Sequence, residues 1–211
     1  MNHKQIIYFY LKSSFDVIFG ILGLILISPL FLLIGISIKI DSKGPIFFKQ
    51  KRIGMHQKHF YIYKFRTMRI DTPRNTPTHQ MKNPDQWITR VGHFLRKTSL
   101  DEIPQMINIA KGEMSFIGPR PALWNQYDLM DEREKRNVHQ VKPGVTGWAQ
   151  VKGRDRLSIK DKAQLDGDYI DLFGAFTDIR IVFLTVRAIL TKDGIVEGGT
   201  GTLEKEADNN D

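Results

Sequence analysis

Residues 94–121 decide the fold, and they read Phe-Leu-Arg-Lys-Thr-Ser-Leu-Asp-Glu-Ile-Pro-Gln-Met-Ile-Asn-Ile-Ala-Lys-Gly-Glu-Met-Ser-Phe-Ile-Gly-Pro-Arg-Pro. The acidic pair Asp101 and Glu102 lies at the centre of this stretch. Apolar residues follow the pair at helical spacing, and a Lys-Gly step then ends the pattern. Pro104 is compatible only with the first turn of such a helix. We therefore place the acidic pair at the start of a helix.

Two interpretations of the acidic pair remain open. Asp101 could be the N-cap or one of the first helical residues, and Ser99 with Glu102 could form a capping box. A plain helix cap would account for these residues taken alone. However, the positive end of a helix dipole also attracts phosphate, and Arg96 and Arg120 flank the pair. The second interpretation is therefore a site for an anion.

The composition indicates one basic domain, with an anchor at most. The 211 residues include no cysteine, which excludes disulfides and thiolate metal sites. The formal charge is +8 although the segment after Gly194 is acidic, so the rest of the chain is strongly basic. Such a charge attracts nucleic acid, acidic lipid headgroups or a phosphorylated substrate.

An uncharged apolar run extends from Val17 to Ile38, after an aromatic-rich segment that contains Lys4 and Lys12. A helix of these 22 residues would be about 33 Å long, enough to cross a bilayer. The run is too long for a signal peptide, and no small-residue cleavage site follows it. It therefore predicts a membrane helix.

That helix could span the membrane or re-enter it. Its length favours a spanning helix. Ser28-Pro29 in the middle favours a bend, because Pro29 cannot donate to the Ile25 carbonyl, which the Ser28 hydroxyl can partly satisfy. Cations flank both ends, and the positive-inside rule would place both ends on the cytoplasmic side.

Residues 46–68 predict a β-hairpin or a pair of short strands around Gly54-Met-His-Gln. Lys64 and Arg66 share one face of the second strand. They could bind an anion as a pair, or they could be two solvated cations on an exposed face.

Most of the other segments predict helices. A short amphipathic helix over 88–95 would deliver Arg96 to the acidic pair, and further helices are expected over 123–139 and 160–172. Residues 141–155 contain two glycines and a proline early in the segment, and we expect them to be irregular.

The last helix is expected over 177–190, with Arg180 and Arg187 on one face. It could pack on the domain or lie on the membrane surface. We expect an exposed loop over 71–84 and a disordered tail after Gly194.

Together these features suit phosphoryl chemistry at a membrane surface. Arginine and lysine neutralise phosphate charge while a phosphoryl bond breaks. Carboxylates can hold Mg²⁺ together with substrate phosphates, or can attack phosphorus and form an acyl phosphate. The residues by themselves do not name a substrate.

A set of longer motifs follows in order between about residues 12 and 190: Ser28-Pro29, Gly44–Gly54, Lys64–Met68, Leu95–Gln105, Gly118–Pro121, Pro143–Val151 and Asp166-x-x-Tyr169. With this ordered set the chain resembles the bacterial sugar transferase family, the small monotopic polyprenol-phosphate phosphoglycosyl transferases. One departure is Lys152-Gly-Arg-Asp155, where the family often has Asn-Gly-Arg-Asn.

The resemblance implies transfer of a sugar 1-phosphate from a UDP-sugar to undecaprenyl phosphate or another polyprenol phosphate, with release of UMP by a ping-pong route. Asp101 would be the nucleophile that becomes a phosphosugar ester, and Glu102 would assist the attack of the lipid phosphate. Mg²⁺ would be the cofactor and would sit at Asp101. The expected substrate-binding cations are Lys64, Arg66, Arg96, Arg120 and Arg154.

The resemblance also implies an α+β, mainly helical fold. Residues 1–40 would form a re-entrant membrane helix broken at Ser28-Pro29. Residues 41–192 would form a cytosol-facing catalytic domain with a small β-hairpin and membrane-surface amphipathic helices, and 193–211 an acidic, disordered tail. The expected location is the cytoplasmic face of a bacterial inner membrane.

The expected partners are membrane lipids and downstream glycosyltransferases of a surface polysaccharide pathway, with no nucleic acid. Another possibility is a membrane-tethered basic module that binds anionic lipid or nucleic acid without catalysis. Such a module has no need for arginines around two acids. A soluble Mg²⁺-dependent nuclease is hard to reconcile with the apolar run.

Overall fold

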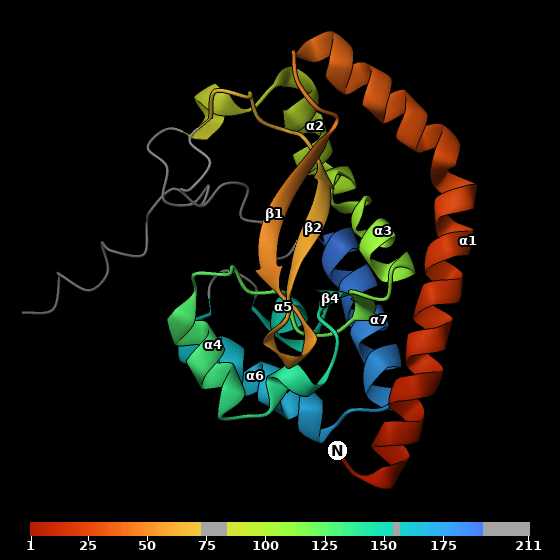
Figure 1. Cartoon of the computed structure of the whole chain (residues 1–211), viewed down its shortest axis with the longest axis vertical. Coiled ribbons are helices and arrows are strands. Elements are labelled where there is room, and N and C mark those ends of the chain that lie inside the picture. The colour runs from red at the N-terminus through yellow and green to blue at the C-terminus, as the bar shows by residue number, and fades with distance from the viewer. Residues whose placement is uncertain (73–83, 154–156, 192–211) are drawn as a thin grey trace, which may run out of the picture.

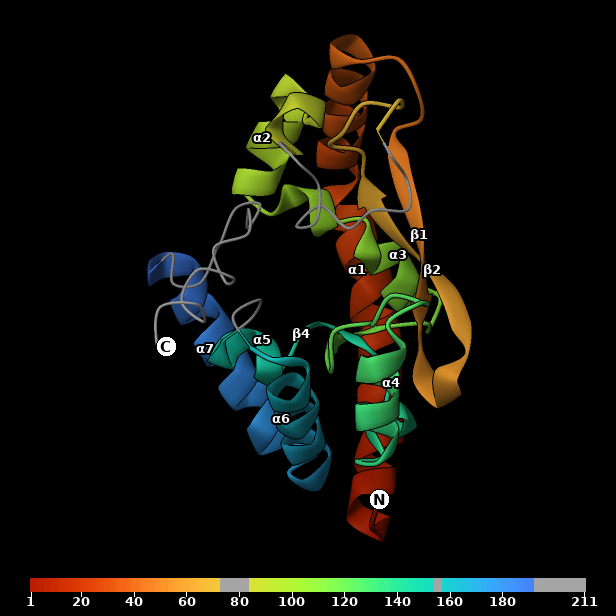
Figure 2. The same ribbon diagram turned by 90° about the vertical axis from the view of Figure 1, so that its left-hand side faces the viewer.

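The computed structural model describes residues 1–72, 84–153 and 157–191. Within them the protein is mainly helical and has two small two-stranded sheets (Figures 1 and 2). Arg154 and the tail after Gly194 lie outside the described residues, and so does most of the loop expected over 71–84. The elements are α1 (His3–Asp41), β1 (Phe47–Ile53), β2 (His59–Phe65), α2 (Arg90–Lys97), α3 (Gln105–Ala110), β3 (Ser115–Ile117), α4 (Tyr127–Glu134), β4 (Gly144–Thr146), α5 (Trp148–Lys152), α6 (Ile159–Asp171) and α7 (Ala175–Thr191).

Helix α1 runs along one side of the molecule and bends over the domain in its upper part (Figure 1). Pro29 lies inside the helix, and Ser28 Oγ donates to the Ile25 carbonyl at 2.8 Å, as predicted. The helix continues through Pro29, so the predicted break is instead a bend within one helix. α1 is long and apolar enough to cross a membrane.

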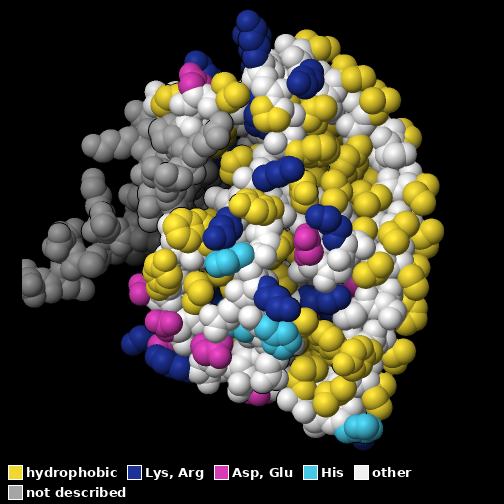
Figure 3. Space-filling model, in the orientation of Figure 1, with side chains coloured by type: hydrophobic (Ala, Val, Ile, Leu, Met, Phe, Trp, Pro, Cys, Tyr) yellow, Lys and Arg dark blue, Asp and Glu magenta, His cyan; other side chains and the backbone are white. Residues whose placement is uncertain are grey.

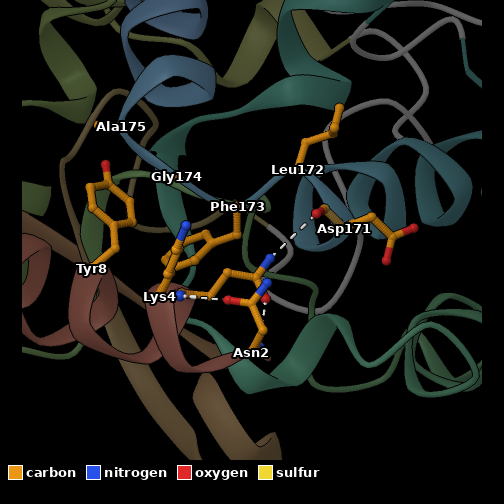
Figure 4. Close-up of a pocket in the computed structure, with 9 residues that line it drawn as sticks. Asn2, Lys4, Tyr8, Asp171, Leu172, Phe173, Gly174 and Ala175 are labelled. Atoms are coloured by element: carbon orange, nitrogen blue, oxygen red, sulfur yellow. Dashed lines mark hydrogen bonds between the residues drawn. The ribbon is translucent and has the colours of Figure 1, made fainter.

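Both ends of α1 are attached to the same domain. Near the start, Gln5 Nε2 donates to the Ile170 carbonyl at 3.1 Å, and Tyr8 Oη donates to Asp178 at 2.8 Å. Figure 4 shows the open pocket at this joint, between the start of α1 and the turn from α6 to α7. At the other end, Asp41 accepts from the Val91 amide at 3.0 Å. The helix therefore begins and ends against the domain.

The middle of α1 packs against α3 through glycines. A Cβ atom on Gly20 would lie 3.1 Å from the backbone nitrogen of Ala110, and one on Gly23 would lie 2.1 Å from Cε of Met106. A larger side chain at Gly20 would press on the backbone of α3, and one at Gly23 would displace the end of the Met106 side chain. These glycines therefore permit a close helix–helix contact.

The predicted hairpin is present, with β1 and β2 antiparallel. Lys64 lies opposite Phe48, and Arg52 lies opposite Phe60. Residues directly opposite each other share a face, and every second residue along a strand does too, so Gln50, Arg52 and Lys64 face the same way. Phe60 and Ile62 on this face pack in a buried cluster with residues in and after α3.

A second core joins β3, α5, α6 and α7 in the lower half of the molecule (Figures 1 and 2). Strands β3 and β4 pair in parallel there, and α5 follows β4 directly. The expectation of an irregular segment over 141–155 was therefore wrong for 144–152. The order comes from a non-local strand pairing, which the local glycines and proline do not reveal.

Large apolar side chains remain exposed on two helices. Figure 3 shows them along the edge formed by α1, while basic side chains gather over the middle of the same face. Helix α7 buries Ile181 and places Arg180 over the Trp148 ring at 5.3 Å, so it packs on the domain through one face. Its other face is apolar and exposed, with Phe176, Ile179, Val182, Phe183, Val186, Ile189 and Leu190.

Candidate active site

The acidic pair lies in a 3-10 turn, Leu100–Glu102, between α2 and α3. The turn begins at Ser99, whose φ of 56° is in the left-handed region, and α3 begins only at Gln105. Pro104 is the N-cap residue of α3, which agrees with its expected place at a helix start. The pair therefore precedes α3 instead of forming its first turn.

The predicted capping box between Ser99 and Glu102 was wrong. The Ser99 side chain makes no capping hydrogen bond, and its left-handed backbone differs from the extended backbone of an ordinary N-cap. Glu102 is engaged elsewhere, because two cations from distant parts of the chain bind its carboxylate.

Those cations are Lys64 and Arg120. Lys64 Nζ lies 2.6 Å from Glu102 Oε1, and Arg120 Nη2 lies 2.8 Å from the same oxygen. Burial by itself would raise the pKa of Glu102, but the charges and hydrogen bonds of Arg120 and Lys64 outweigh it and hold the pKa well below its usual range. Glu102 is therefore ionised at neutral pH.

Asp101 has a different environment. Among the described residues, no hydrogen bond or ion pair engages its carboxylate, although the charges of Lys64, Arg96 and Arg120 act on it. Burial raises the pKa of Asp101, the nearby cations offset part of that rise, and the charge of Glu102 adds to it. Asp101 is thus a more basic carboxylate than an ordinary aspartate.

Arg96 completes the cation cluster from the last turn of α2, as predicted. Its Nε donates to Thr67 Oγ1 at 2.9 Å, and that bond fixes the direction of the side chain. Burial lowers the pKa of Arg96, and the charge of Asp101 partly offsets this change. No hydrogen bond within the described chain uses the Arg96 Nη groups, so they can bind an anion.

Arg66 has a role other than the expected pairing with Lys64 at an anion site. Its guanidinium is buried and donates to the carbonyls of Lys43 and Ser42 at 2.6 and 2.7 Å. It thereby fixes the turn that follows α1. The two residues do share a strand face by spacing, but β2 ends at Phe65, and Arg66 turns toward the chain after α1. Arg154, the remaining predicted cation, is outside the described residues.

Two further residues shape the site, and the sequence reading assigned neither of them to it. Arg52 donates from Nη1 to the Pro121 carbonyl at 2.9 Å and from Nη2 to Gln50 Oε1 at 2.6 Å. The alternation of β1 could have revealed Arg52, because cross-strand pairing puts it on the face of Lys64.

Asn108 is fully buried in α3. Its side chain accepts from the Tyr63 amide at 3.0 Å and donates to the Tyr61 carbonyl at 2.8 Å. These bonds join α3 to β2, which carries Lys64. The only sequence signal for the role of Asn108 was its position as a polar residue among apolar neighbours, and the sequence does not reveal its hydrogen-bond partners.

The residues present fit a magnesium ion that arrives with its substrate. The described part of the chain has no group of three or more His, Asp or Glu side chains that could hold a metal. However, Mg²⁺ is commonly held by one or two carboxylates together with substrate phosphates. The unengaged carboxylate of Asp101 can supply such a ligand.

Comparison with known proteins identifies the family of the chain. The family described as bacterial sugar transferase matches residues 7–192. The uncharacterized sugar transferase EpsL of Bacillus subtilis (strain 168) is 39% identical over 195 residues, which are 92% of this chain and 95% of EpsL.

Two longer relatives have more specific names. The UDP-glucose:undecaprenyl-phosphate glucose-1-phosphate transferase of Escherichia coli (strain K12) is 42% identical over 83% of this chain. The UDP-N-acetylgalactosamine-undecaprenyl-phosphate N-acetylgalactosaminephosphotransferase of Aeromonas hydrophila is 38% identical over 89% of this chain. The matches cover 39% and 45% of those relatives, less than half of their length.

Proposed function

Since the chain belongs to the bacterial sugar transferase family, we propose that it transfers a sugar 1-phosphate from a UDP-sugar to undecaprenyl phosphate and releases UMP. The names of two relatives support the substrate classes, although those relatives differ from each other in the sugar. The observation that carries the proposal is the contrast between adjacent acids within one cation cluster: Glu102 is paired twice, whereas no hydrogen bond or ion pair from a described residue engages Asp101.

In the first half-reaction a carboxylate oxygen of Asp101 attacks the phosphorus that bears the sugar. An oxygen–phosphorus bond forms to Asp101, the bond from that phosphorus to the UMP oxygen breaks, and UMP leaves with the electron pair. The raised pKa of Asp101 supports this role, because a more basic carboxylate is a better nucleophile. The neighbouring cations neutralise charge on the phosphates as the bond breaks.

In the second half-reaction a phosphate oxygen of the lipid attacks the same phosphorus, and the Asp101 carboxylate is the leaving group. The product carries the sugar on a diphosphate bridge to the lipid. Glu102 assists by keeping Lys64 and Arg120 directed at this point. In the first half-reaction, Mg²⁺ held by Asp101 and the substrate phosphates would supply further neutralisation of the donor diphosphate.

The membrane arrangement that we propose is re-entrant, with the catalytic domain on the cytoplasmic side. Support comes from α1, whose two ends are hydrogen-bonded to the same domain. A helix that crossed the bilayer once would carry one of these ends about 30 Å away to the opposite face. The outward apolar faces of α1 and α7 would contact lipid and bring the lipid phosphate to the site.

The test is incubation of the detergent-solubilised protein with UDP-sugars, undecaprenyl phosphate and Mg²⁺, while UMP release is measured. We expect Asp101→Asn to abolish UMP release and the phosphosugar adduct that intact-mass measurement should detect without lipid. Asp131→Asn, an exposed change on α4, is the matched control.

Normal turnover by Asp101→Asn would show that another group is the nucleophile. If no UDP-sugar yields UMP and the protein only binds anionic vesicles in a salt-dependent way, a membrane-tethered basic module is the better description.

A further inference from the structure

Arg120 lies between elements, on the segment that follows β3, whereas Lys64 lies on β2 and Arg96 on α2. Two guanidinium groups donate to successive carbonyls of this segment. Arg133 Nη1 lies 2.9 Å from the Arg120 carbonyl, and Arg52 Nη1 lies 2.9 Å from the Pro121 carbonyl. One backbone bond supports the same contact, from the Ile53 amide to the Ala122 carbonyl at 3.0 Å.

Each of these arginines is fixed from a different side. Gln50, two residues before Arg52 on the same strand face, accepts from Arg52 Nη2 at 2.6 Å. Asp166 of α6 accepts from Arg133 Nε at 2.9 Å. The Arg120 segment is thus attached to the hairpin through Arg52 and to the lower core through Arg133.

We propose that Arg52 is a positioning residue, which holds the Arg120 segment so that the Arg120 side chain reaches Glu102 and the phosphate site beside it. Arg52 acts through the Pro121 carbonyl, to which its Nη1 donates, while its Nη2 donates to Gln50 of the same strand. Its Nε is buried and has no hydrogen-bond partner within the described chain.

The arrangement also places positive charges close together before an anion arrives. Burial lowers the pKa of Arg52 to about 10, and the charge of Arg120 adds to this effect. Without the Arg52 contact, the backbone that carries Arg120 would be held less firmly against the repulsion between the two guanidinium groups. The hydrogen bonds of Arg52 therefore keep Arg120 in place against that repulsion, which a bound diphosphate would relieve.

The first arm of the test does not depend on turnover. Hydrogen exchange is measured for peptides that contain Ile53, whose amide reports the contact with Ala122. Arg52→Met should make this amide exchange about tenfold faster. Arg52→Lys, which can still reach one carbonyl, should change it less. The control is Lys49→Met, on the other face of the same strand. Unchanged exchange in Arg52→Met would overturn the proposal.

The second arm rests on the proposed function and uses a double-mutant cycle. Arg52→Met should reduce kcat/KM for UMP release by about tenfold, and it should have no further effect in an Arg120→Ala background. An equal loss in both backgrounds would mean that Arg52 acts independently of Arg120, and the proposal would fall. If the parent releases no UMP, the proposed function fails, while the exchange measurement still decides whether Arg52 holds the segment.

Discussion

The Nζ atom of Lys64 lies 2.6 Å from Oε1 of Glu102, and this ion pair connects strand β2 to the turn that carries both acids. The pair gives two adjacent carboxylates opposite properties. Glu102 has its pKa lowered by Arg120 and Lys64 against the effect of burial, whereas burial raises the pKa of Asp101. The difference leads to predictions for stability as well as for turnover.

The two acids should affect folding stability in opposite directions at neutral pH. A carboxyl whose pKa is raised by folding destabilises the folded protein above its unfolded pKa, and a carboxyl whose pKa is depressed stabilises it there. Asp101→Asn should therefore raise the melting temperature, and Glu102→Gln should lower it. Differential scanning fluorimetry in detergent measures both, with Asp131→Asn expected to match the parent. A lower melting temperature for Asp101→Asn would contradict the assigned environment.

The pH dependence of turnover should follow Asp101. Because its pKa lies above the ordinary value of 3.8, kcat/KM should fall as the pH decreases through that raised pKa. Among the cations, Lys64 lowers the pKa of Asp101 most, so Lys64→Met should raise that pKa and move the acidic limb of the profile to higher pH. The measurement is UMP release across a pH series for both proteins. A limb that moved to lower pH would argue against Asp101 as the titrating group.

Lys64 and Arg66, neighbours on one strand face by spacing, should have separable roles. Lys64→Met should reduce kcat/KM by about 100-fold, the usual cost of one electrostatic donor at a reacting phosphoryl group. Arg66→Met should leave kcat/KM nearly unchanged but cost about 2 kcal/mol of unfolding free energy, because it removes charged hydrogen bonds to two carbonyls. Chemical unfolding and steady-state kinetics on both variants decide the matter, and a large kinetic loss in Arg66→Met would restore it to the site.

Local patterns predicted most of the elements of this chain. Hydrophobic period and length gave α1, α2, α6 and α7, and alternation gave the hairpin. The Ser28 bond to the Ile25 carbonyl followed from the chemistry of proline. The β3–β4 pair did not follow, because its strands are three residues each and are separated in the sequence by a segment that contains α4. Short non-local pairings leave no periodic trace in a sequence.

The sequence allowed candidate site residues to be named, but not the contacts between them. Spacing and flanking charge indicated Asp101, Glu102 and the arginines around them. Which acid is paired depends on the side chains of Lys64 and Arg120, which approach from distant elements. Arg66 illustrates the same limit, because a shared strand face does not decide where a long side chain turns once the strand has ended.

The buried ion pair between Arg133 on α4 and Asp166 on α6 should contribute strongly to the stability of the fold. Asp166→Ala leaves the Arg133 charge buried and unpaired, and we expect a loss of about 3–5 kcal/mol. Asp168→Ala on the same helix is the control and should cost under about 1 kcal/mol. The measurement is unfolding in denaturant. Equal effects of the two changes would mean that the pair is not what holds α4 to α6.

A double variant separates stability from positioning at this pair. Arg133→Met with Asp166→Leu replaces the charges by apolar groups of similar size, which often restores stability. In this double variant kcat/KM should be lower than in the parent even if stability is restored, because the Arg120 carbonyl has lost the donor Arg133. Full recovery of kcat/KM would show that Arg133 contributes nothing to the placement of Arg120.

The topology of α1 can be tested directly, since the chain has no cysteine of its own. Single cysteines at His3 and Lys43 mark the two ends of the helix, and one at Lys58 marks the exposed hairpin loop of the domain. All three should react with an impermeant maleimide from the cytoplasmic side of inverted vesicles and none from the outside of intact cells. Leu26→Cys, in the exposed apolar face, should react only after detergent is added, because it lies in lipid. Labelling of positions 3 and 43 from opposite sides would rule out a re-entrant helix, since the attachment of both ends to one domain could not then exist in the membrane.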